Sequence, residues 1–276
     1  MQRADRGRME INRRMWDESV GLHTGSPSYD VPRFKKGWIP ILPLEIREVG
    51  PVRGQTLLHL QCHFGMDTLS WARRGARVTG VDFSPAAVAA ARQLAAEVGL
   101  DARFVRSNVY TAAQRLHDTF DVVYTGKGAL CWLPDLTRWA KTVARFLKPG
   151  GRLFFLEDHP LSEAYQRGRD ADRLVLTNPY FRHQPIRDES PGTYAAPEAK
   201  LRNALSFSWI HPVSEVLNAL IDAGLRIERM IEYPYTYWHK FPFLRQGRDG
   251  FWHLREEDGE IPLMYSLRAR RPLSAR

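Results

Sequence analysis

Cysteine is scarce in this chain of 276 residues, which holds only Cys62 and Cys131. Two cysteines are too few for the disulfide framework that staples small secreted domains. With 43% hydrophobic and 26% charged residues, a chain of this length can bury a sizeable core without disulfides or metals. We therefore expect an ordinary globular protein of the reducing cytoplasm.

Long apolar runs are missing as well. No stretch approaches the roughly 18 uninterrupted apolar residues of a membrane-spanning helix. Residues 1–16 are rich in arginine, but no apolar run follows them as it would in a secretory signal. The sequence thus predicts neither a membrane span nor a membrane partner.

Lysine is rare beside arginine. Only 7 of the 40 basic residues are Lys, which leaves 33 Arg, and the formal net charge is +9. Such a balance is typical of proteins that neutralise the phosphates of nucleic acids. The arginines are scattered, however, and no long basic run is interleaved with aromatic residues. A nucleic-acid partner is therefore only an alternative, and the sequence does not indicate the oligomeric state.

Short apolar runs alternate with helical patterns from residue 55 onward. Strands are expected at 56–60, 77–82, 102–105, 120–124, 152–156, 225–231 and 262–269, and helices at 67–74, 86–97, 135–147 and 214–223. Ser84 and Pro85 suit the N-cap and the first turn of the helix at 86–97. Before residue 55, two short helices are expected at 9–19 and 39–48. Strands that alternate with helices form βαβ units. The predicted fold class is α/β, with a doubly wound, mostly parallel sheet of seven strands and helices on both faces.

Two residues at neighbouring strand tips carry the first functional signal. Gly65 supplies a tight turn after the first strand, where backbone N–H groups and the next helix can reach a ligand. Asp82, at the tip of the second strand, is placed to accept hydrogen bonds from ribose hydroxyls. A glycine and an acid at these positions suit a ligand that contains adenosine.

Four segments resemble a known family. Residues 59–65 (HLQCHFG) resemble motif I of the class I S-adenosylmethionine-dependent methyltransferases, and residues 81–85 (VDFSP) resemble their motif II. Residues 105–109 (VRSNV) are similar to the family's adenine-holding segment, and residues 147–153 (LKPGGRL) to its turn into the fifth strand. The resemblance covers roughly residues 55–158 and implies a Rossmann-like methyltransferase fold.

Motif I departs from the family pattern. His59 stands where the family usually has an acid, and Gln61 and His63 stand where it has glycines, so that only Gly65 of the three glycines is kept. Asn108 replaces the more usual Asp, although its amide oxygen can still accept from the adenine amino group. We expect side-chain help from Gln61 or His63 in holding the methionine end of the cofactor.

The resemblance implies S-adenosyl-L-methionine as cofactor. The residues that it places around the cofactor are Tyr29, Leu60, Gln61, His63, Gly65, Asp82, Phe83, Ser107, Asn108, Val109, Thr125 and Gly126. It also implies four parts of the chain. These are a lid segment (1–50) with Trp16, His23 and Tyr29 over the site, a cofactor-binding core (51–158), a substrate-covering insertion (159–208) and a completion of the sheet (209–276).

An O–H or N–H acceptor must lose a proton, and histidine suits this task near neutral pH. His159 is the first candidate base, followed by His211 and His183, while Tyr124 lies where acceptor contacts are expected. No metal site is expected, since His59, Cys62 and His63 lie in a buried strand and a cofactor loop, and no second cluster completes a set. Lys127 is a candidate for orienting an acidic acceptor.

The aromatic residues of the insertion and the C-terminal part suit a small, partly apolar acceptor. They are Tyr180, Phe181, Tyr194, Phe207, Trp209, Tyr235, Tyr237, Trp238 and Trp252. The prediction is methyl transfer to O, N or C of a small molecule. Two alternatives remain open, an RNA or DNA methyltransferase and a non-catalytic protein that binds the same cofactor.

Overall fold

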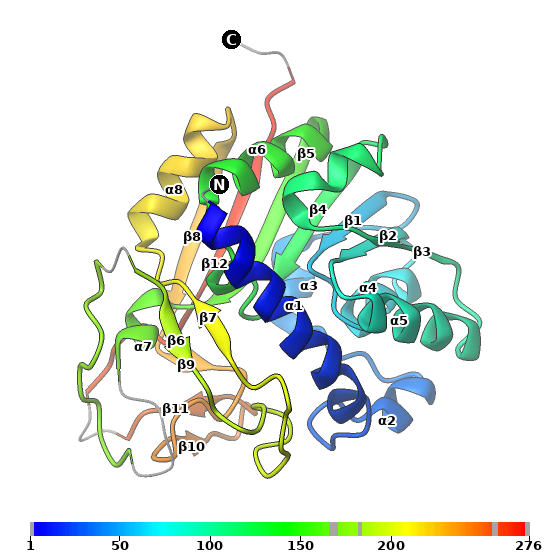
Figure 1. The fold of residues 1–276 in the computed structure, drawn as a ribbon. Helices are drawn as coiled ribbons and strands as arrows, with labels where there is room; N and C mark the ends of the chain where they lie inside the picture. The colour runs from blue at the N-terminus through cyan, green and yellow to red at the C-terminus, as the bar shows by residue number, and fades with distance from the viewer. Residues whose placement is uncertain (1–2, 166–170, 182–183, 256–258, 274–276) are drawn as a thin grey trace.

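The computed structural model describes residues 3–165, 171–181, 184–255 and 259–273. A sheet of seven strands in the order β3-β2-β1-β4-β5-β12-β8 runs through its centre (Figure 1). The strands are β1 (Thr56–Leu60), β2 (Arg77–Asp82), β3 (Ala102–Arg106), β4 (Phe120–Gly126), β5 (Leu147–Asp158), β8 (Arg226–Tyr233) and β12 (Met264–Arg270). The first five are parallel, and β12 is antiparallel to both neighbours. The predicted fold class is confirmed.

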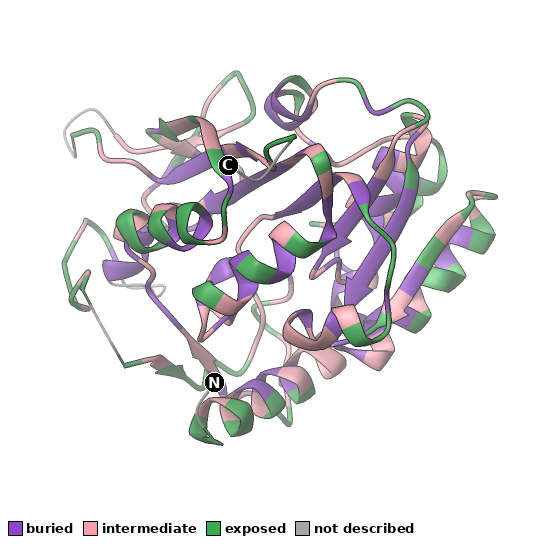
Figure 2. Cartoon of the chain, turned by 90° about the horizontal axis from the view of Figure 1, so that it is seen from above, coloured by how far each residue is buried: buried purple, intermediate pink, exposed green. Residues whose placement is uncertain are grey.

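Helices cover both faces of the sheet. One face packs against α6 (Leu136–Phe146), α8 (Val213–Asp222) and the 3-10 helix η1 (Val109–Gln114), and the other against α3 (Pro43–Val49), α4 (Met66–Arg73) and α5 (Pro85–Glu97). Figure 2 shows the buried strands between helices whose outer sides are exposed. In β1, Leu58 and Leu60 pack on the side of α6 and Leu57 on the side of α4. This explains why β1 carries leucines on both faces of the sheet.

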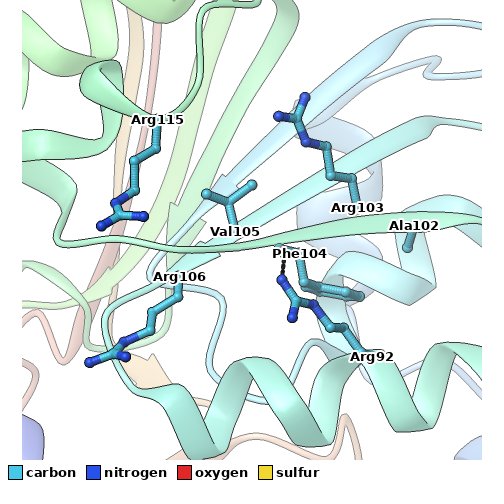
Figure 3. A pocket seen from close by; sticks show the side chains of 7 residues that line it. All are labelled: Arg92, Ala102, Arg103, Phe104, Val105, Arg106 and Arg115. Atoms are coloured by element: carbon cyan, nitrogen blue, oxygen red, sulfur yellow. Dashed lines mark hydrogen bonds between the residues drawn. The ribbon is translucent and has the colours of Figure 1, made fainter.

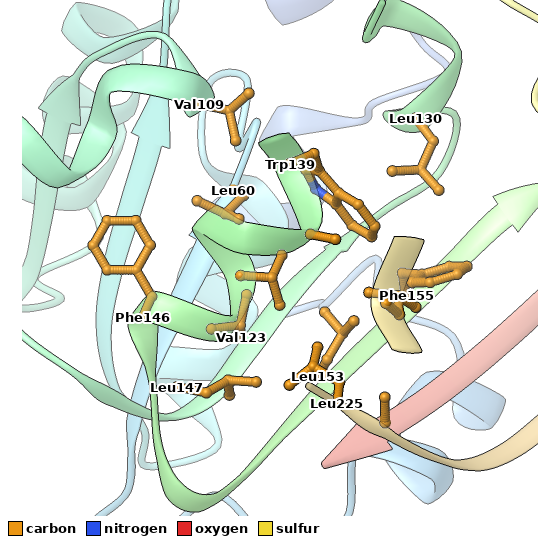
Figure 4. Packing of buried hydrophobic residues seen from close by; sticks show 14 of the residues in the cluster. Leu60, Val109, Val123, Leu130, Trp139, Phe146, Leu147, Leu153, Phe155 and Leu225 are labelled. Atoms are coloured by element: carbon orange, nitrogen blue, oxygen red, sulfur yellow. The ribbon is translucent and has the colours of Figure 1, made fainter. Parts of the chain in front are cut away.

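Helix α6 shows how the spacing of apolar residues fixes this packing. Trp139, Val143 and Phe146 recur at intervals of three and four residues and are fully buried. They lie over Leu60 and Val123 of the sheet (Figure 4). The side chain of Asp135 accepts the Arg138 N–H at 2.9 Å and caps the first turn.

The N-terminal part is more helical than the expected helices at 9–19 and 39–48. Helix α1 spans Arg3–Thr24, and ion pairs of Arg13 with Glu10 and Asp17 link successive turns. A short helix, α2 (Val31–Lys35), follows it. Helix α3 begins only at Pro43, because proline is tolerated in the first turn of a helix but not in its interior.

Two smaller sheets lie beside the large one. Strands β6 (Ile186–Asp188) and β7 (Ser206–Ser208) form an antiparallel pair after the short helix α7 (Pro160–Ala164). Strands β9 (Tyr235–Thr236), β10 (Arg245–Gln246) and β11 (Trp252–His253) form the second small sheet. Figure 1 shows α1 between β7 and α5, and the Asn12 side chain of α1 exchanges two 2.8 Å hydrogen bonds with the Phe207 backbone. None of the described helices is long and apolar enough to cross a membrane.

Candidate active site

The tips of β1 and β2 meet at the carboxyl edge of the sheet. The His63 N–H donates to Asp82 Oδ2 at 2.8 Å, and the Ser84 N–H donates to Asp82 Oδ1 at 2.9 Å. Burial raises the pKa of Asp82 to about 6, although these backbone N–H groups act in the opposite direction. Each carboxyl oxygen has a second lone pair, so Asp82 can still accept from ligand hydroxyls.

Gly65 ends the loop after β1 and precedes α4. Its φ of +82° favours glycine, and a Cβ at this position would lie 2.8 Å from the Phe104 ring. Gln61 and His63 also adopt left-handed conformations, with φ of +58° and +50°. Two side chains are thus held where glycine would meet no strain.

Phe83, Ser107 and Asn108 line a groove of about 710 Å³ between the tip of β2 and helix α1. The Ser107 N–H donates to the Asp82 backbone oxygen at 2.8 Å, and Asn108 Oδ1 accepts the Tyr110 N–H at 3.0 Å. An aromatic ring beside polar edge atoms fits adenine. Val109 packs instead in the hydrophobic core beneath α6.

Four rings that we name the aromatic cover lie over the β1 loop: Trp16 and His23 of α1, Tyr29 of the following loop and Tyr194 of the insertion. The Trp16 and His23 ring centroids are 5.3 and 5.1 Å from that of His63, and Tyr29 lies 4.8 Å from Phe64. The Tyr29 and Tyr194 hydroxyls are hydrogen-bonded. Segments far apart in the chain therefore enclose one loop.

Leu60, Thr125 and Gly126 hold the tips of neighbouring strands together. The Thr125 hydroxyl donates to the Leu60 carbonyl at 3.1 Å. Gly126 lies so close to β5 that a Cβ would be 2.7 Å from the Leu156 oxygen. These contacts give the three residues a role in fixing the strand tips.

Tyr124 and Lys127 belong to an ionic cluster beneath this loop. The Tyr124 hydroxyl donates to Glu45 of α3. Lys127 Nζ lies 2.9 Å from Asp67 Oδ2 and 3.3 Å from Glu45 Oε2. Burial raises the pKa of Glu45, and the carboxylates of Asp67 and Glu45 raise the pKa of Lys127 against the effect of its own burial. Both predicted residues are thus already paired inside the protein.

A second acidic cluster lies at the tip of β5. Glu157 accepts the Ala129 and Leu130 N–H groups at 3.0 and 3.3 Å, and its burial raises its pKa to about 8. Asp158 accepts from Trp238 Nε1 at 3.1 Å and lies 3.4 Å from Lys240 Nζ. The sequence showed these two acids only as neighbours of His159.

The candidate histidines lie apart from the β1 loop. His159 Nδ1 accepts the Leu161 N–H at 3.1 Å, and Nε2 donates to Glu232 at 2.9 Å, so both ring nitrogens are engaged. His211 Nε2 donates to the Leu133 carbonyl at 2.7 Å. His183 lies outside the described residues. Within the described ranges, no three His, Cys, Asp or Glu side chains gather as metal ligands.

Residues 58–153 match a family model described as a methyltransferase domain. These residues form a methyltransferase domain. Over 152 residues the chain is 29% identical to a ubiquinone biosynthesis O-methyltransferase of Pseudomonas entomophila (strain L48), a match over 55% of this chain and 61% of that protein. It is 34% identical over 128 residues to the methyltransferase phqN of Penicillium fellutanum, with 45% and 38% covered. The chain therefore spans less than two thirds of either relative.

Solved structures share the fold of the domain. A crystal structure of an S-adenosylmethionine-dependent methyltransferase from Mesorhizobium loti superposes with a TM-score of 0.58 at 24% identity, over 83% of this chain and 96% of that one. The expected membership of the S-adenosylmethionine-dependent methyltransferase family is confirmed by these comparisons.

Arginines gather along β3, at the edge of the methyltransferase domain. Arg92, Arg103, Arg106 and Arg115 line a groove of about 640 Å³ along this strand (Figure 3). Arg106 and Arg115 also line the neighbouring 710 Å³ groove, together with Arg6, Arg13 and Arg138. Scattered in the sequence, these arginines share one surface in the fold.

Four polar residues around the site were not predicted from the sequence: Asp17, Glu45, Asp67 and Lys240. Asp17 of α1 accepts from the Ser84 hydroxyl and from the Ala86 N–H at the start of α5. No local pattern marks these residues, because each of them contacts a segment at least 60 residues away in the chain.

Proposed function

We propose that this protein transfers the methyl group of S-adenosylmethionine to O, N or C of a small-molecule acceptor. The observation that carries the proposal is the position of Asp82, 2.8 Å from the backbone nitrogen of His63 in the loop that ends at Gly65. An acid suited to the ribose thus lies beside the glycine turn, which supports the proposal. The cysteine usage supports a cytoplasmic location as part of the same proposal.

The residues present fit the cofactor. Asp82 would hold the ribose, Phe83, Ser107 and Asn108 would flank the adenine, and the β1 loop would hold the methionine end. When bound, S-adenosylmethionine supplies a methyl group already activated on a sulfonium. The protein must then align the acceptor and exclude water, a task that the aromatic cover suits.

We assign the acceptor to the tips of β4 and β5. Tyr194 lies 6.0 Å from Trp238, and Trp238 donates to Asp158. A Cβ on Gly128 would be 3.9 Å from both Asp158 Oδ2 and the Tyr237 hydroxyl, so these groups face the loop after β4. Aromatic walls with a few polar groups suit a small acceptor.

Asp158 is our candidate for receiving the acceptor proton. His159 has both ring nitrogens engaged, and His211 and Tyr124 are engaged with Leu133 and Glu45. An Asp158→Asn variant is expected to bind S-adenosylhomocysteine normally but to lose roughly 100-fold in turnover on an acceptor that must be deprotonated.

Calorimetry with S-adenosylhomocysteine tests the cofactor assignment, and absence of binding at millimolar ligand would reject it. Transfer of a radiolabelled methyl group from S-adenosylmethionine to a pool of metabolites tests the reaction. Cofactor binding without any labelled product would favour the alternative of a non-catalytic protein.

The arginine grooves favour a second candidate, a nucleic-acid acceptor. The affinity for a random oligonucleotide, measured over a salt series, separates the two candidates. Several phosphate contacts would give a steep fall in affinity with salt, whereas a small-molecule enzyme would show weak binding throughout.

A further inference from the structure

The loop after β1 holds two side chains in a conformation that glycine adopts freely. Gln61 and His63 have φ of +58° and +50°, a region where residues with a side chain are strained. Strain of this kind persists where the surroundings hold it in place, and it often marks a functional site. The contacts of the two side chains show what holds them in this conformation.

His63 is held by a histidine from helix α1. His63 Nε2 lies 2.9 Å from His23 Nδ1, and the two rings meet edge to face at 5.1 Å. Burial lowers the pKa of both imidazoles, so both are neutral at pH 7 and one donates its proton to the other. His23 is fully buried, and its other nitrogen, Nε2, has no partner among the described residues.

Gln61, like His23, has one side-chain atom that is hydrogen-bonded and one that is buried without a partner among the described residues. Its Nε2 donates to the Ala129 carbonyl at 2.8 Å, which fixes the orientation of the amide. The remaining amide atom, Oε1, is buried and has no partner within the described ranges. Six buried side-chain atoms of the described residues lack a partner, and these two lie at the β1 loop, where a ligand would pair with them.

The chemistry of the two atoms indicates the kind of ligand group. An amide oxygen only accepts hydrogen bonds. When His63 Nε2–H donates to His23 Nδ1, His23 Nε2 carries a proton and becomes a donor. One acceptor and one donor match the ammonium and the carboxylate of an α-amino acid.

We propose that Gln61 and His23 hold the amino-acid end of S-adenosylmethionine, with Gln61 Oε1 accepting from the α-ammonium and His23 Nε2 donating to the α-carboxylate. This inference rests on the proposed function. It gives α1 a direct part in cofactor binding. His63, which stands at a glycine position of motif I, contacts His23 of α1, about 40 residues away in the chain.

Calorimetry with three probes tests the proposal. S-adenosylhomocysteine carries both charged groups, decarboxylated S-adenosylmethionine keeps only the ammonium, and 5′-methylthioadenosine has neither. His23→Asn places an amide oxygen near the position of Nδ1, which keeps the contact with His63 and removes Nε2. His23→Gln places an amide nitrogen near the position of Nε2. Gln61→Met removes Oε1, and His117→Ala, at an exposed site, is the matched control.

The expected results differ for each pair of variant and probe. His23→Asn should weaken S-adenosylhomocysteine binding about 10- to 100-fold, the range for losing a hydrogen bond to a charged group. It should leave the other two probes within about threefold, and His23→Gln should restore part of the loss. Gln61→Met should weaken both probes that carry the ammonium and spare 5′-methylthioadenosine.

Equal losses for all three probes would show that His23 only docks α1 on the loop, and unchanged S-adenosylhomocysteine binding would show that it does not touch the ligand. Either result overturns the inference and leaves the proposed function standing. If the unmodified protein binds neither S-adenosylhomocysteine nor 5′-methylthioadenosine, the proposed function itself fails. Thermal unfolding shows which variants fold, and if His23→Asn does not, Gln61→Met and His23→Gln still decide the matter.

Discussion

The tips of β1 and β2 lie side by side but are built differently. At the β2 tip most contacts are local: Ser84 Oγ accepts the Ala87 N–H and Asn108 Oδ1 accepts the Tyr110 N–H, although the Ser84 hydroxyl also donates to Asp17 of α1. Asp82, which accepts from the His63 and Ser84 N–H groups, follows the family pattern. The β1 tip departs from it, and its side chains pair with His23 and Ala129, about 40 and 68 residues away. One half of the site is thus formed mainly by local sequence, and the other half only when distant segments fold onto it.

This difference shows how a departure from a motif can be compensated. Where glycines are lost, the strain at Gln61 and His63 is balanced by contacts that glycine could not make. The two tips should therefore contribute to folding and binding in different ways.

Gly65→Ala should destabilise the protein most, because glycine at this position of the β1 loop is required and not merely typical. The added Cβ would lie 2.8 Å from the Phe104 ring at a φ of +82°. Overpacking and left-handed strain together should cost roughly 2–4 kcal/mol in urea unfolding. Gly99→Ala, with φ of +64° but open space around it, should cost only about 1–2 kcal/mol for the same strain. Equal losses would show that the fit to Phe104 is unimportant.

Asp82→Ala should weaken S-adenosylhomocysteine binding by about 1–3 kcal/mol, since it truncates a buried hydrogen-bond partner. In contrast to the His23 variants, it should weaken 5′-methylthioadenosine to the same extent, because both ligands contain the ribose. Asp101→Ala, at an exposed position before β3, is the control. A loss restricted to the ligand with the amino-acid end would place Asp82 at the wrong end of the cofactor.

The pH dependence of binding should separate the two tips. Burial raises the pKa of Asp82 to about 6, and ligand hydroxyls favour the ionised carboxylate. Affinity for 5′-methylthioadenosine should therefore be constant above pH 7 and should fall as pH drops below 6, by at most about tenfold per pH unit. Because burial lowers the pKa of His23 to about 4, the β1 tip should add nothing in this window. Asp82→Asn should abolish the dependence, and its persistence there would assign it to another group.

Tyr29→Phe should have the smallest effect. It removes the hydroxyl that pairs with Tyr194 across the aromatic cover. Since Tyr194 is 54% exposed, the loss in unfolding free energy should be about 0.5–1 kcal/mol. Tyr194→Phe should cost about the same, and the double variant should cost no more than either single one. Additive losses would indicate that the two hydroxyls act separately.

The sequence predicted most of the sheet because each strand is encoded by its own apolar run and turn. It located Gly65 and Asp82 for the same reason, since both follow directly from strand ends. The helix expected at 9–19 lies within the longer α1, whose length depends on ion pairs and packing that no apolar pattern shows. The helix expected at 39–48 begins only at Pro43. For the histidines, the residue type alone suggested a base, whereas the structure shows His159 and His211 engaged in hydrogen bonds.

The sequence alone predicts the α/β class, the order of the parallel strands' motifs and the pair of residues at the first two strand tips. It could do so because hydrophobic periodicity and glycine turns act over a few neighbouring residues. The three-dimensional structure is needed to show that α1 and the insertion cover the β1 loop and that Glu45, Asp67 and Lys127 form one cluster. It also shows that His23 and Gln61 each have a buried polar atom without a partner among the described residues. Those features depend on which distant segments come into contact, and a local sequence pattern does not show which segments those are.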